Sequence, residues 1–422
     1  MANNGVVGTL NRAGWRGRRW GRAIAGVIAK APPSPWWLRV LVIFTISRVV
    51  STWILLDFAA RQGQNAWTGA SPNYFDFAKI WDGHWYYIVS VVGYPSDLPI
   101  TADGHVGESA WAFMPAYPAL VRTLTFATGL DFSIIAVVVS FGFALAAALM
   151  FYRLMHIMLP SGTAMFSVVL FCFAPLSPIM QVSYAESMHA FLLTVALYLL
   201  IKRRYWMLLP VIAVMALTRP SGLAFALALC LHAGYRWWVR ETEPFPLGER
   251  VASAIAAAFS ALMGVAWLLI AWAVTGSLTA YTDTELAWRA PYVGYRELVP
   301  FTPWIQGASF WGSIWGIPYP VGLIILGTLV LAFAAFMFTP WVRRLGVDLR
   351  FWVASYLLYL LAVFFPQSST FRLLVPVFPL LGAIAQPRSL IYRIGIVLLF
   401  IAGQWGWVHI AWWVDGYDWT PP

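Results

Sequence analysis

The segment Trp81-Asp82-Gly83-His84-Trp85-Tyr86-Tyr87 combines a carboxylate, a histidine and aromatic rings within one short stretch. Gly93-Tyr94-Pro95 and Ala112-Phe113-Met114-Pro115-Ala116-Tyr117-Pro118 follow it along the chain. A carboxylate or a histidine in such a place can take a proton from a reacting hydroxyl. Because almost everything around these residues is apolar, this stretch is where chemistry on a water-soluble group is expected.

Asp82 is the first candidate for a catalytic group. Residues 72–92 are predicted to form an amphipathic helix on the membrane surface, in which Asp82 and Tyr86 share a face. As a general base, Asp82 would take a proton from an acceptor hydroxyl. As an ordinary acid, it would pair with Lys79, three residues earlier. Two other acids near the outer end of the first predicted span are alternative bases, Asp57 and Asp76.

Two arginines stand beside polar, turn-forming residues. Arg219 lies in Thr218-Arg219-Pro220-Ser221-Gly222, and Arg372 follows Ser368-Ser369-Thr370. A guanidinium group can bind a phosphate through two parallel hydrogen bonds, which favours a phosphate site. Snorkelling to lipid headgroups is the alternative for both arginines. Glu186, in Tyr184-Ala185-Glu186-Ser187, would bind sugar hydroxyls or cap a helix.

Histidines and a loop of acids leave further alternatives open. His84 would hydrogen-bond a sugar or phosphate, or else a backbone group at the membrane interface. Asp103, His105 and Glu108 invite a metal interpretation, but three ligands in one loop are weak evidence, and neither a metal nor another cofactor is predicted. The predicted site therefore has Asp82 as its catalytic residue. Its predicted substrate-binding residues are His84, Tyr86, Tyr117, Tyr184, Glu186, His189, Arg219 and Arg372.

The composition places these residues in a polytopic membrane protein. Of the 422 residues, 61% are hydrophobic and 10% are charged, against about 25% charged in soluble proteins. The net charge of +10 comes from short basic clusters beside apolar segments, which is the positive-inside pattern and not a nucleic-acid signal. Eleven spans are predicted, at 36–58, 132–153, 163–181, 185–201, 206–218, 220–236, 251–274, 318–339, 351–366, 371–386 and 390–413.

The charges also predict the topology. With the N-terminus inside, 19 of the 27 Lys and Arg residues fall on the cytoplasmic side and 13 of the 17 Asp and Glu residues on the outer side. Segment 111–128 is rejected as a twelfth span because Pro115, Pro118 and Arg122 interrupt it. Every unusual polar motif then faces outward, which predicts one wet cavity there. Arg48, in the middle of the first span, needs a buried partner that the sequence does not identify.

The predicted organisation is a basic cytoplasmic tail at 1–35 and a single transmembrane catalytic domain at 36–422. External loops are predicted at 59–131 and 275–317. The expected location is the plasma membrane, with the active site on its extracytoplasmic face.

Several motifs together resemble the GPI mannosyltransferase II (PIG-V) family, including its bacterial members. Ser47-Arg48 in the first predicted span is similar to the beginning of that family's sequences. The loop that starts at Trp81-Asp82 and ends at Gly93-Tyr94 resembles the family's first external loop. Residues 112–118 resemble its AFFPLYP segment, with Met114 and Ala116 as departures. The stretch 178–187 resembles its proline-then-YSES stretch. The segment 218–222 is similar to its arginine motif, with Ser221 where Asn is common.

The resemblance implies an all-α GT-C glycosyltransferase whose catalytic acid lies in the first external loop. It implies a polyprenyl-phosphate mannose donor, a glycolipid or glycan acceptor and an inverting displacement. The residues agree with it in one respect, since no nucleotide-binding glycine-rich loop is present on the cytoplasmic side. Two alternatives remain: a GT-C transferase for another lipid-linked sugar, and a lipid or sugar transporter, although no repeated halves are visible.

Overall fold

The computed structural model describes residues 34–414, and the described part is built from helices with one isolated antiparallel bridge between Ile100 and Val106. The all-α prediction is therefore confirmed for these residues. The predicted tail at 1–35 lies, apart from its last two residues, outside the described residues.

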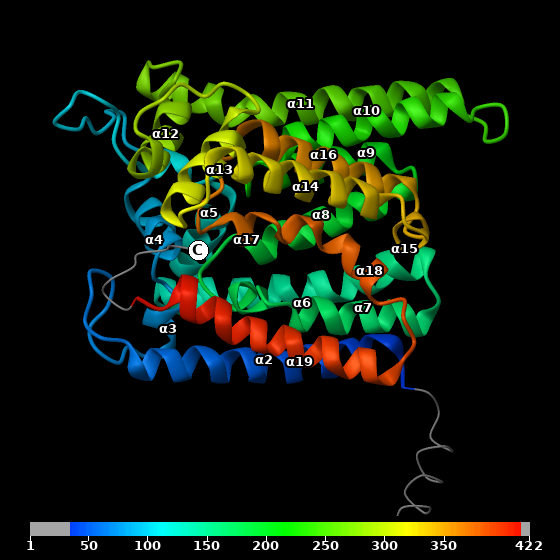
Figure 1. The fold of residues 1–422 in the computed structure, drawn as a ribbon, viewed down its shortest axis with the longest axis horizontal. Helices are drawn as coiled ribbons and strands as arrows, with labels where there is room; N and C mark the ends of the chain where they lie inside the picture. Colours follow the sequence, from blue (N-terminus) through cyan, green and yellow to red (C-terminus); the bar gives the residue numbers. More distant parts are fainter. Residues whose placement is uncertain (1–33, 415–422) are drawn as a thin grey trace, which may run out of the picture.

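Five helices are long and apolar enough to cross a membrane, and they run nearly parallel in Figure 1. Each coincides with a predicted span, because a run of about 20 apolar residues is the strongest signal such a sequence carries. They are α2 (Trp36–Arg61), α6 (Phe132–Met158), α11 (Leu247–Thr275), α14 (Tyr319–Met337) and α19 with η4 (Leu390–Trp407 and Val408–Trp412).

The other six predicted spans are helical but shorter, so the count of eleven stays a prediction. A helix of 13 residues is only about 20 Å long, against about 30 Å of hydrocarbon. These elements are α7 (Ser161–Phe173) with η2 (Ser177–Gln181), α8 (Glu186–Ile201), α9 (Tyr205–Ala216), α10 (Gly222–Trp238), α16 (Val347–Val363), and α17 (Thr370–Leu373) with η3 (Val375–Leu380) and α18 (Leu381–Ile384). A four-residue helix, α15 (Pro340–Arg343), precedes α16.

Arg48 connects α2 to the interruption between the short helices α7 and η2. It is buried in α2, and its guanidinium donates to the carbonyl oxygens of Cys172 at 2.7 Å and Ser177 at 2.8 Å. Cys172 lies in the last turn of α7, where the helix itself leaves its carbonyl without a partner, and Ser177 is the first residue of η2. A cation there also suits the negative end of the helix dipole.

The predicted external loops are largely helical. The first contains α3 (Tyr74–Phe77), α4 (Asp82–Val92), η1 (Ala110–Ala112) and α5 (Ala116–Thr128), and the second contains α12 (Ala280–Val293) and α13 (Thr302–Ile314). At 13 residues α5 is too short to span a membrane, which agrees with the rejection of a span at 111–128. In Figure 1, α3, α4, α5 and α12 gather at one end of the long helices.

One helix prediction is wrong. The single amphipathic helix expected at 72–92 is broken between α3 and α4 by a turn, in which the Gly83 N–H donates to the Ile80 carbonyl at 3.2 Å. Trp81 takes φ +59° in this turn, a conformation that disfavours helix continuation. Lys79 and Asp82 consequently do not share a helix face, and Lys79 pairs instead with Asp76, at 3.9 Å.

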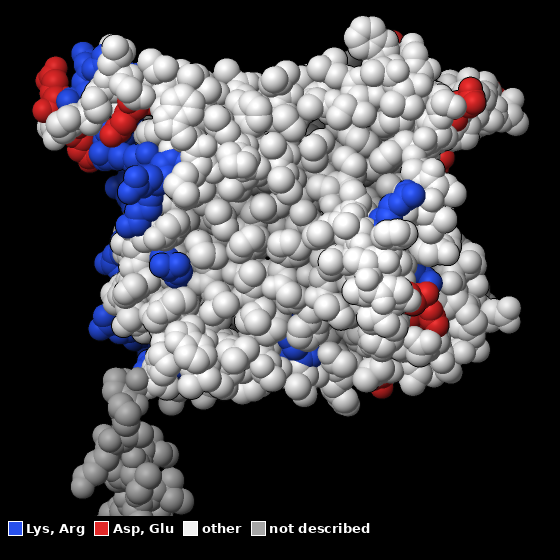
Figure 2. All heavy atoms as spheres, turned by 180° about the vertical axis from the view of Figure 1, so that it is seen from behind, with Lys and Arg blue, Asp and Glu red and all other residues white. Residues whose placement is uncertain are grey.

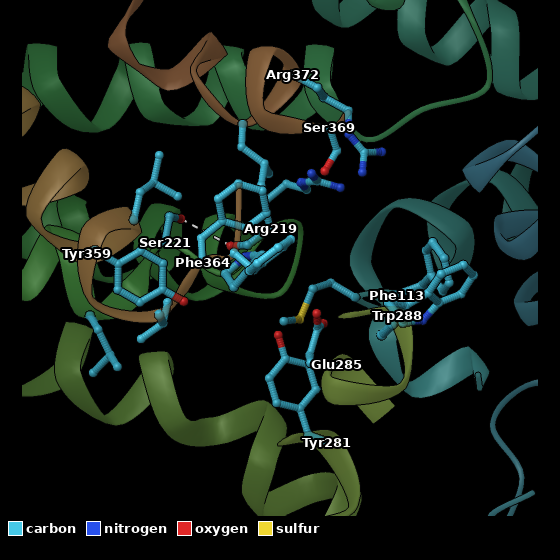
Figure 3. A pocket seen from close by; sticks show the side chains of 18 of the residues that line it. Phe113, Arg219, Ser221, Tyr281, Glu285, Trp288, Tyr359, Phe364, Ser369 and Arg372 are labelled. Carbon is cyan, nitrogen blue, oxygen red and sulfur yellow. Dashed lines mark hydrogen bonds between the residues drawn. The ribbon is translucent and has the colours of Figure 1, made fainter. Parts of the chain in front are cut away.

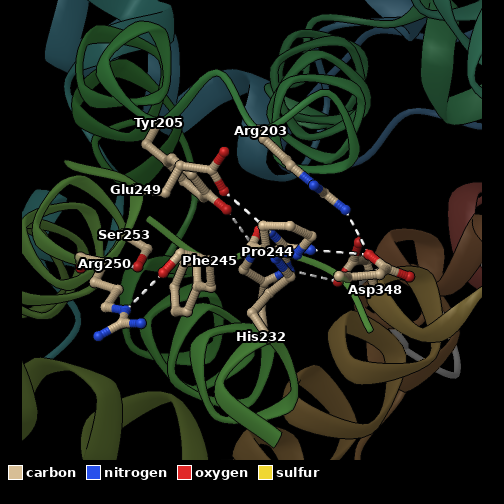
Figure 4. A network of polar contacts seen from close by, with 11 residues as sticks. Arg203, Tyr205, His232, Pro244, Phe245, Glu249, Arg250, Ser253 and Asp348 are labelled. Carbon is tan, nitrogen blue, oxygen red and sulfur yellow. Dashed lines mark hydrogen bonds and ion pairs between the residues drawn. The ribbon is translucent and has the colours of Figure 1, made fainter. Parts of the chain in front are cut away.

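Basic side chains gather at the opposite end, as Figure 2 shows from behind. Exposed ones at the end of α15 and after α8, α10, α15 and α18 include Lys202, Arg203, Arg204, Arg240, Arg343, Arg344 and Arg388. Behind them lies a polar network that we term the histidine cluster: Tyr205, His232, Arg236, Glu249 and Asp348 (Figure 4). His232 bridges the Tyr205 hydroxyl at 2.8 Å and the Asp348 carboxylate at 2.6 Å, which joins α9, α10 and α16.

Candidate active site

A cavity of about 380 Å³ lies at the end of the helices where α4, α5 and α12 gather. Four charged side chains from distant parts of the chain line it, and we term them the acid–arginine cluster: Asp82, Glu186, Arg219 and Arg372. Apolar residues of α11 and α16 form another wall, among them Val265, Leu268, Leu360 and Val363. The cavity therefore has a charged side and an apolar side.

Asp82 is placed by the turn that breaks the predicted helix. It opens α4, and its backbone N–H donates to the Tyr184 hydroxyl at 3.0 Å. A Cβ at Gly83 would lie 3.3 Å from Ser183, so a glycine lets the start of α4 approach the segment before α8. The Asp82 carboxylate is 15% exposed, forms an ion pair with Arg372, and lies 3.9 Å from Arg219.

Glu186 completes the cluster from the first turn of α8. It is 4% exposed, and its Oε1 lies 3.2 Å from Arg219 and 3.7 Å from Arg372. Neither Glu186 oxygen has a partner in hydrogen-bond geometry, and the same is true of Arg372 Nε. Two acids and two arginines balance in charge, yet the cluster keeps hydrogen-bonding capacity unused. Unused donors and acceptors of this kind can be satisfied by a polar ligand.

The residues that follow Arg219 in its motif hold it at the cavity. Its serine, Ser221, shares a hydrogen bond with His189 Nε2 at 3.0 Å and donates to the Arg219 carbonyl at 3.1 Å. Gly222 begins α10, and a Cβ there would lie 2.6 Å from the Cα of Gly264 in α11. Only paired glycines allow this approach, and it sets Arg219 at the cavity wall.

Arg372 comes from α17, close to the cavity residue Ser369 (Figure 3). Its guanidinium lies 5.5 Å from the centre of the buried Tyr184 ring, a cation–π distance. Tyr184 therefore orients both members of the Asp82–Arg372 pair.

Four of the predicted substrate-binding residues do not line the cavity, namely His84, Tyr86, Tyr117 and Tyr184. His84 packs edge-on against Trp67 at 5.4 Å, and burial, followed by Lys79, lowers its pKa. The three tyrosines pack behind Asp82, and the Tyr117 hydroxyl donates to the Ala136 carbonyl at 3.0 Å. This geometry makes them supports for the site, and a role in binding substrate stays a prediction.

The alternative bases and the metal interpretation find no support in the geometry. Asp57 pairs with Arg61 and Asp76 with Lys79, and neither acid lines the cavity. The His105 ring stacks on Tyr295 at 4.0 Å. Within residues 34–414, no group of three His, Cys, Asp or Glu side chains is arranged to hold a metal ion.

Sequence reasoning missed the contribution of α12, which brings Tyr281, Glu285, Trp288 and Arg289 to the cavity. The first three are spaced four and three residues apart, so they share one helix face. Figure 3 shows the Tyr281 hydroxyl and the Glu285 carboxyl projecting together. The Glu285 side chain is exposed to the cavity, and desolvation by the surrounding protein raises the pKa of its carboxyl to about 7.

Comparisons with known proteins add little to this geometry. No family model matches the chain, and no curated protein does either. Among solved structures, it is similar to an oligosaccharyltransferase from Archaeoglobus fulgidus tethered with an acceptor peptide, at 12% identity and a TM-score of 0.40. The match covers 88% of this chain and 54% of the other, so this chain spans about half of that protein's length.

Proposed function

We propose that this protein is a membrane glycosyltransferase of the GT-C type that transfers mannose from a polyprenyl-phosphate donor to a glycolipid or glycan acceptor. The observation that carries the proposal is the acid–arginine cluster, which stands at a cavity with an apolar wall. Three of the motifs that resemble the PIG-V family supply Asp82, Glu186 and Arg219 to that cluster, and the choice of mannose rests on this resemblance.

The cavity suits an amphiphilic donor. Its volume of about 380 Å³ falls within the usual range of small-molecule sites, roughly 300–1,000 Å³. The charged side can accept a sugar and a phosphate, and the apolar wall of α11 and α16 can contact the first part of a lipid chain. A nucleotide sugar has no need of such a wall.

In the proposed reaction, the Asp82 carboxylate takes the proton of the acceptor hydroxyl. The acceptor oxygen then bonds to the anomeric carbon of mannose while the bond from that carbon to the phosphate oxygen breaks. Its electron pair leaves with the lipid phosphate, so a single displacement inverts the anomeric configuration. Arg219 and Arg372 hold Asp82 in place, and an arginine of the cavity offsets the negative charge that develops on the phosphate.

The proposed side of the reaction is the extracytoplasmic face of the plasma membrane. The exposed basic cluster of Lys202, Arg203, Arg204, Arg240, Arg343, Arg344 and Arg388 lies at the end of the molecule opposite the cavity, as Figure 2 illustrates, and basic residues prefer the cytoplasmic side.

Reconstitution tests the proposal. Liposomes containing the purified protein, polyprenyl-phosphate mannose and a membrane glycolipid extract should yield mannosylated product without any nucleotide sugar. Parallel liposomes with polyprenyl-phosphate glucose test the sugar. Product that forms from GDP-mannose alone, in liposomes free of lipid donor, would overturn the donor assignment.

A further inference from the structure

Arg289 of α12 is a buried cation whose side chain has no counter-ion in the described structure. It is 5% exposed and lines the cavity, and the ion pairs found within residues 34–414 do not include it. Its Nη2 donates to the Arg296 carbonyl, but Nε and Nη1 have no partner. A buried, unpaired guanidinium is costly, so a ligand that supplies negative charge would be favoured there.

The contrast with the other two arginines of the cavity is what singles out Arg289. Arg219 and Arg372 are balanced by Asp82 and Glu186, so a phosphate could reach them only by competing with those acids. Burial, followed by the neighbouring Arg296, lowers the pKa of Arg289, which reflects a positive charge that no acid stabilises.

The buried polar side-chain atoms of α12 that have no partner are all donors. Besides the two Arg289 nitrogens, the indole Nε1 of Trp288 is buried without a partner, and Trp288 also lines the cavity. A set of unpaired N–H donors that includes a guanidinium favours an anion with several acceptor oxygens, and a phosphoryl group is the common biological example.

We propose that Arg289 binds the phosphoryl group of an amphiphilic phosphate in this cavity. The inference rests on the proposed function, in which this group belongs to the lipid-linked donor and becomes the leaving group. Arg289 would then receive the negative charge that develops on the phosphate, with no ion pair to break first, while the acid–arginine cluster serves the acceptor side.

Binding measurements on the full-length protein in neutral phosphatidylcholine nanodiscs test the proposal. Farnesyl phosphate should bind at least about tenfold more tightly than farnesol, because a hydrogen bond to a charged group is worth about that factor. Arg289→Gln should remove this preference and leave farnesol binding unchanged. Arg289→Lys keeps the positive charge but lacks the planar guanidinium that can donate two parallel hydrogen bonds. This variant should keep part of the preference for farnesyl phosphate over farnesol. Arg122→Gln, at an exposed arginine of α5, is the charge-matched control and should bind as the unchanged protein does.

Three results would overturn the proposal. Arg289→Gln could bind farnesyl phosphate normally, or farnesol could bind as well as its phosphate. Phosphatidylglycerol could displace farnesyl phosphate at equal concentration, which would assign the cation to a bilayer headgroup. Because binding is measured without sugar transfer, failure of mannose transfer with an intact Arg289-dependent affinity would refute the proposed function alone. Normal transfer with an unchanged donor KM in Arg289→Gln would refute this inference alone.

Discussion

The acid–arginine cluster and the histidine cluster lie at opposite ends of the same helices, and they differ in how completely their charges are paired. In the histidine cluster, His232 has a partner on each ring nitrogen, and Arg236 contacts Glu249 at 3.1 Å and Glu243 at 2.8 Å. The one buried side-chain atom of this cluster without a hydrogen bond is Arg236 Nε. In the acid–arginine cluster, both Glu186 oxygens and Arg372 Nε lack a hydrogen bond.

The difference separates two uses of buried charge. A network in which nearly every donor and acceptor is satisfied ties helices together, as His232 does for α9, α10 and α16. A network with unused capacity beside a cavity is less stabilising but can accept a ligand. Both ends are rich in charge, so charge alone would not distinguish the candidate active site.

The largest effect that would sharpen this comparison is expected from Asp82→Asn. Asparagine keeps the shape of the side chain but cannot accept the proton, so turnover should fall about 100- to 10,000-fold in a mannose-transfer assay. Membrane insertion should be unchanged, but Arg372 loses its ion pair, so thermal unfolding should shift as well and turnover is compared per folded molecule. Lys79→Ala is the control, because Lys79 pairs with Asp76 and should leave most activity. Near-normal turnover in Asp82→Asn would remove it as the base.

Gly222→Ala should affect both stability and activity. The new Cβ would lie 2.6 Å from Gly264 backbone atoms, which forces α10 and α11 apart and moves Arg219. Overpacking of this kind costs about 1–3 kcal/mol, measurable by thermal unfolding, and turnover of the folded fraction should also drop. Gly234→Ala, on the same helix with nothing within 4 Å, is the matched control. Equal behaviour of the two variants would contradict the close approach.

His232→Phe should destabilise the histidine cluster at the opposite end of the helices. It leaves the Asp348 carboxylate and the Tyr205 hydroxyl without their shared partner, at a cost of about 1–3 kcal/mol in the free energy of unfolding. Turnover per folded molecule should be unchanged. Cys230→Ser, exposed on the same helix, provides the comparison. A loss of turnover as large as that of Asp82→Asn would show that the two ends do not divide the roles as proposed.

The smallest expected effect is a pH slope from Glu285. Its pKa is about 7 in the folded protein, against an ordinary value of 4.5, so the folded state holds this proton more tightly than the unfolded chain. Its contribution to stability is therefore present below about pH 4.5 and is lost as pH rises through 7. Melting temperatures recorded from pH 5 to 8 should fall less steeply in Glu285→Gln. An unchanged slope would show that Glu285 does not titrate there.

Much of this arrangement could be predicted from the sequence, but only where hydrophobic runs or unusual polar residues mark it. Every predicted span is helical, and Asp82, Glu186, Arg219 and Arg372 meet although nearly 300 residues separate the first from the last. The turn at Trp81 and the helix α12 could not be predicted. A single strained residue leaves no periodic pattern, and α12 is polar enough to pass for a loop. The distant partners of Arg48 are backbone carbonyls, which residues of any type can supply.

Arg48 also has a consequence for how the chain is made. Its two carbonyl partners are 124 and 129 residues further along, so α2 is synthesised long before these hydrogen bonds can form. An arginine at the centre of a lone helix opposes insertion by about 2.5–3.5 kcal/mol. The first helix should therefore enter the bilayer stably only when α7 and η2 have emerged from the ribosome. Nascent chains halted before Ser161 should leave α2 extractable from microsomes, and chains that extend beyond Gln181 should retain it.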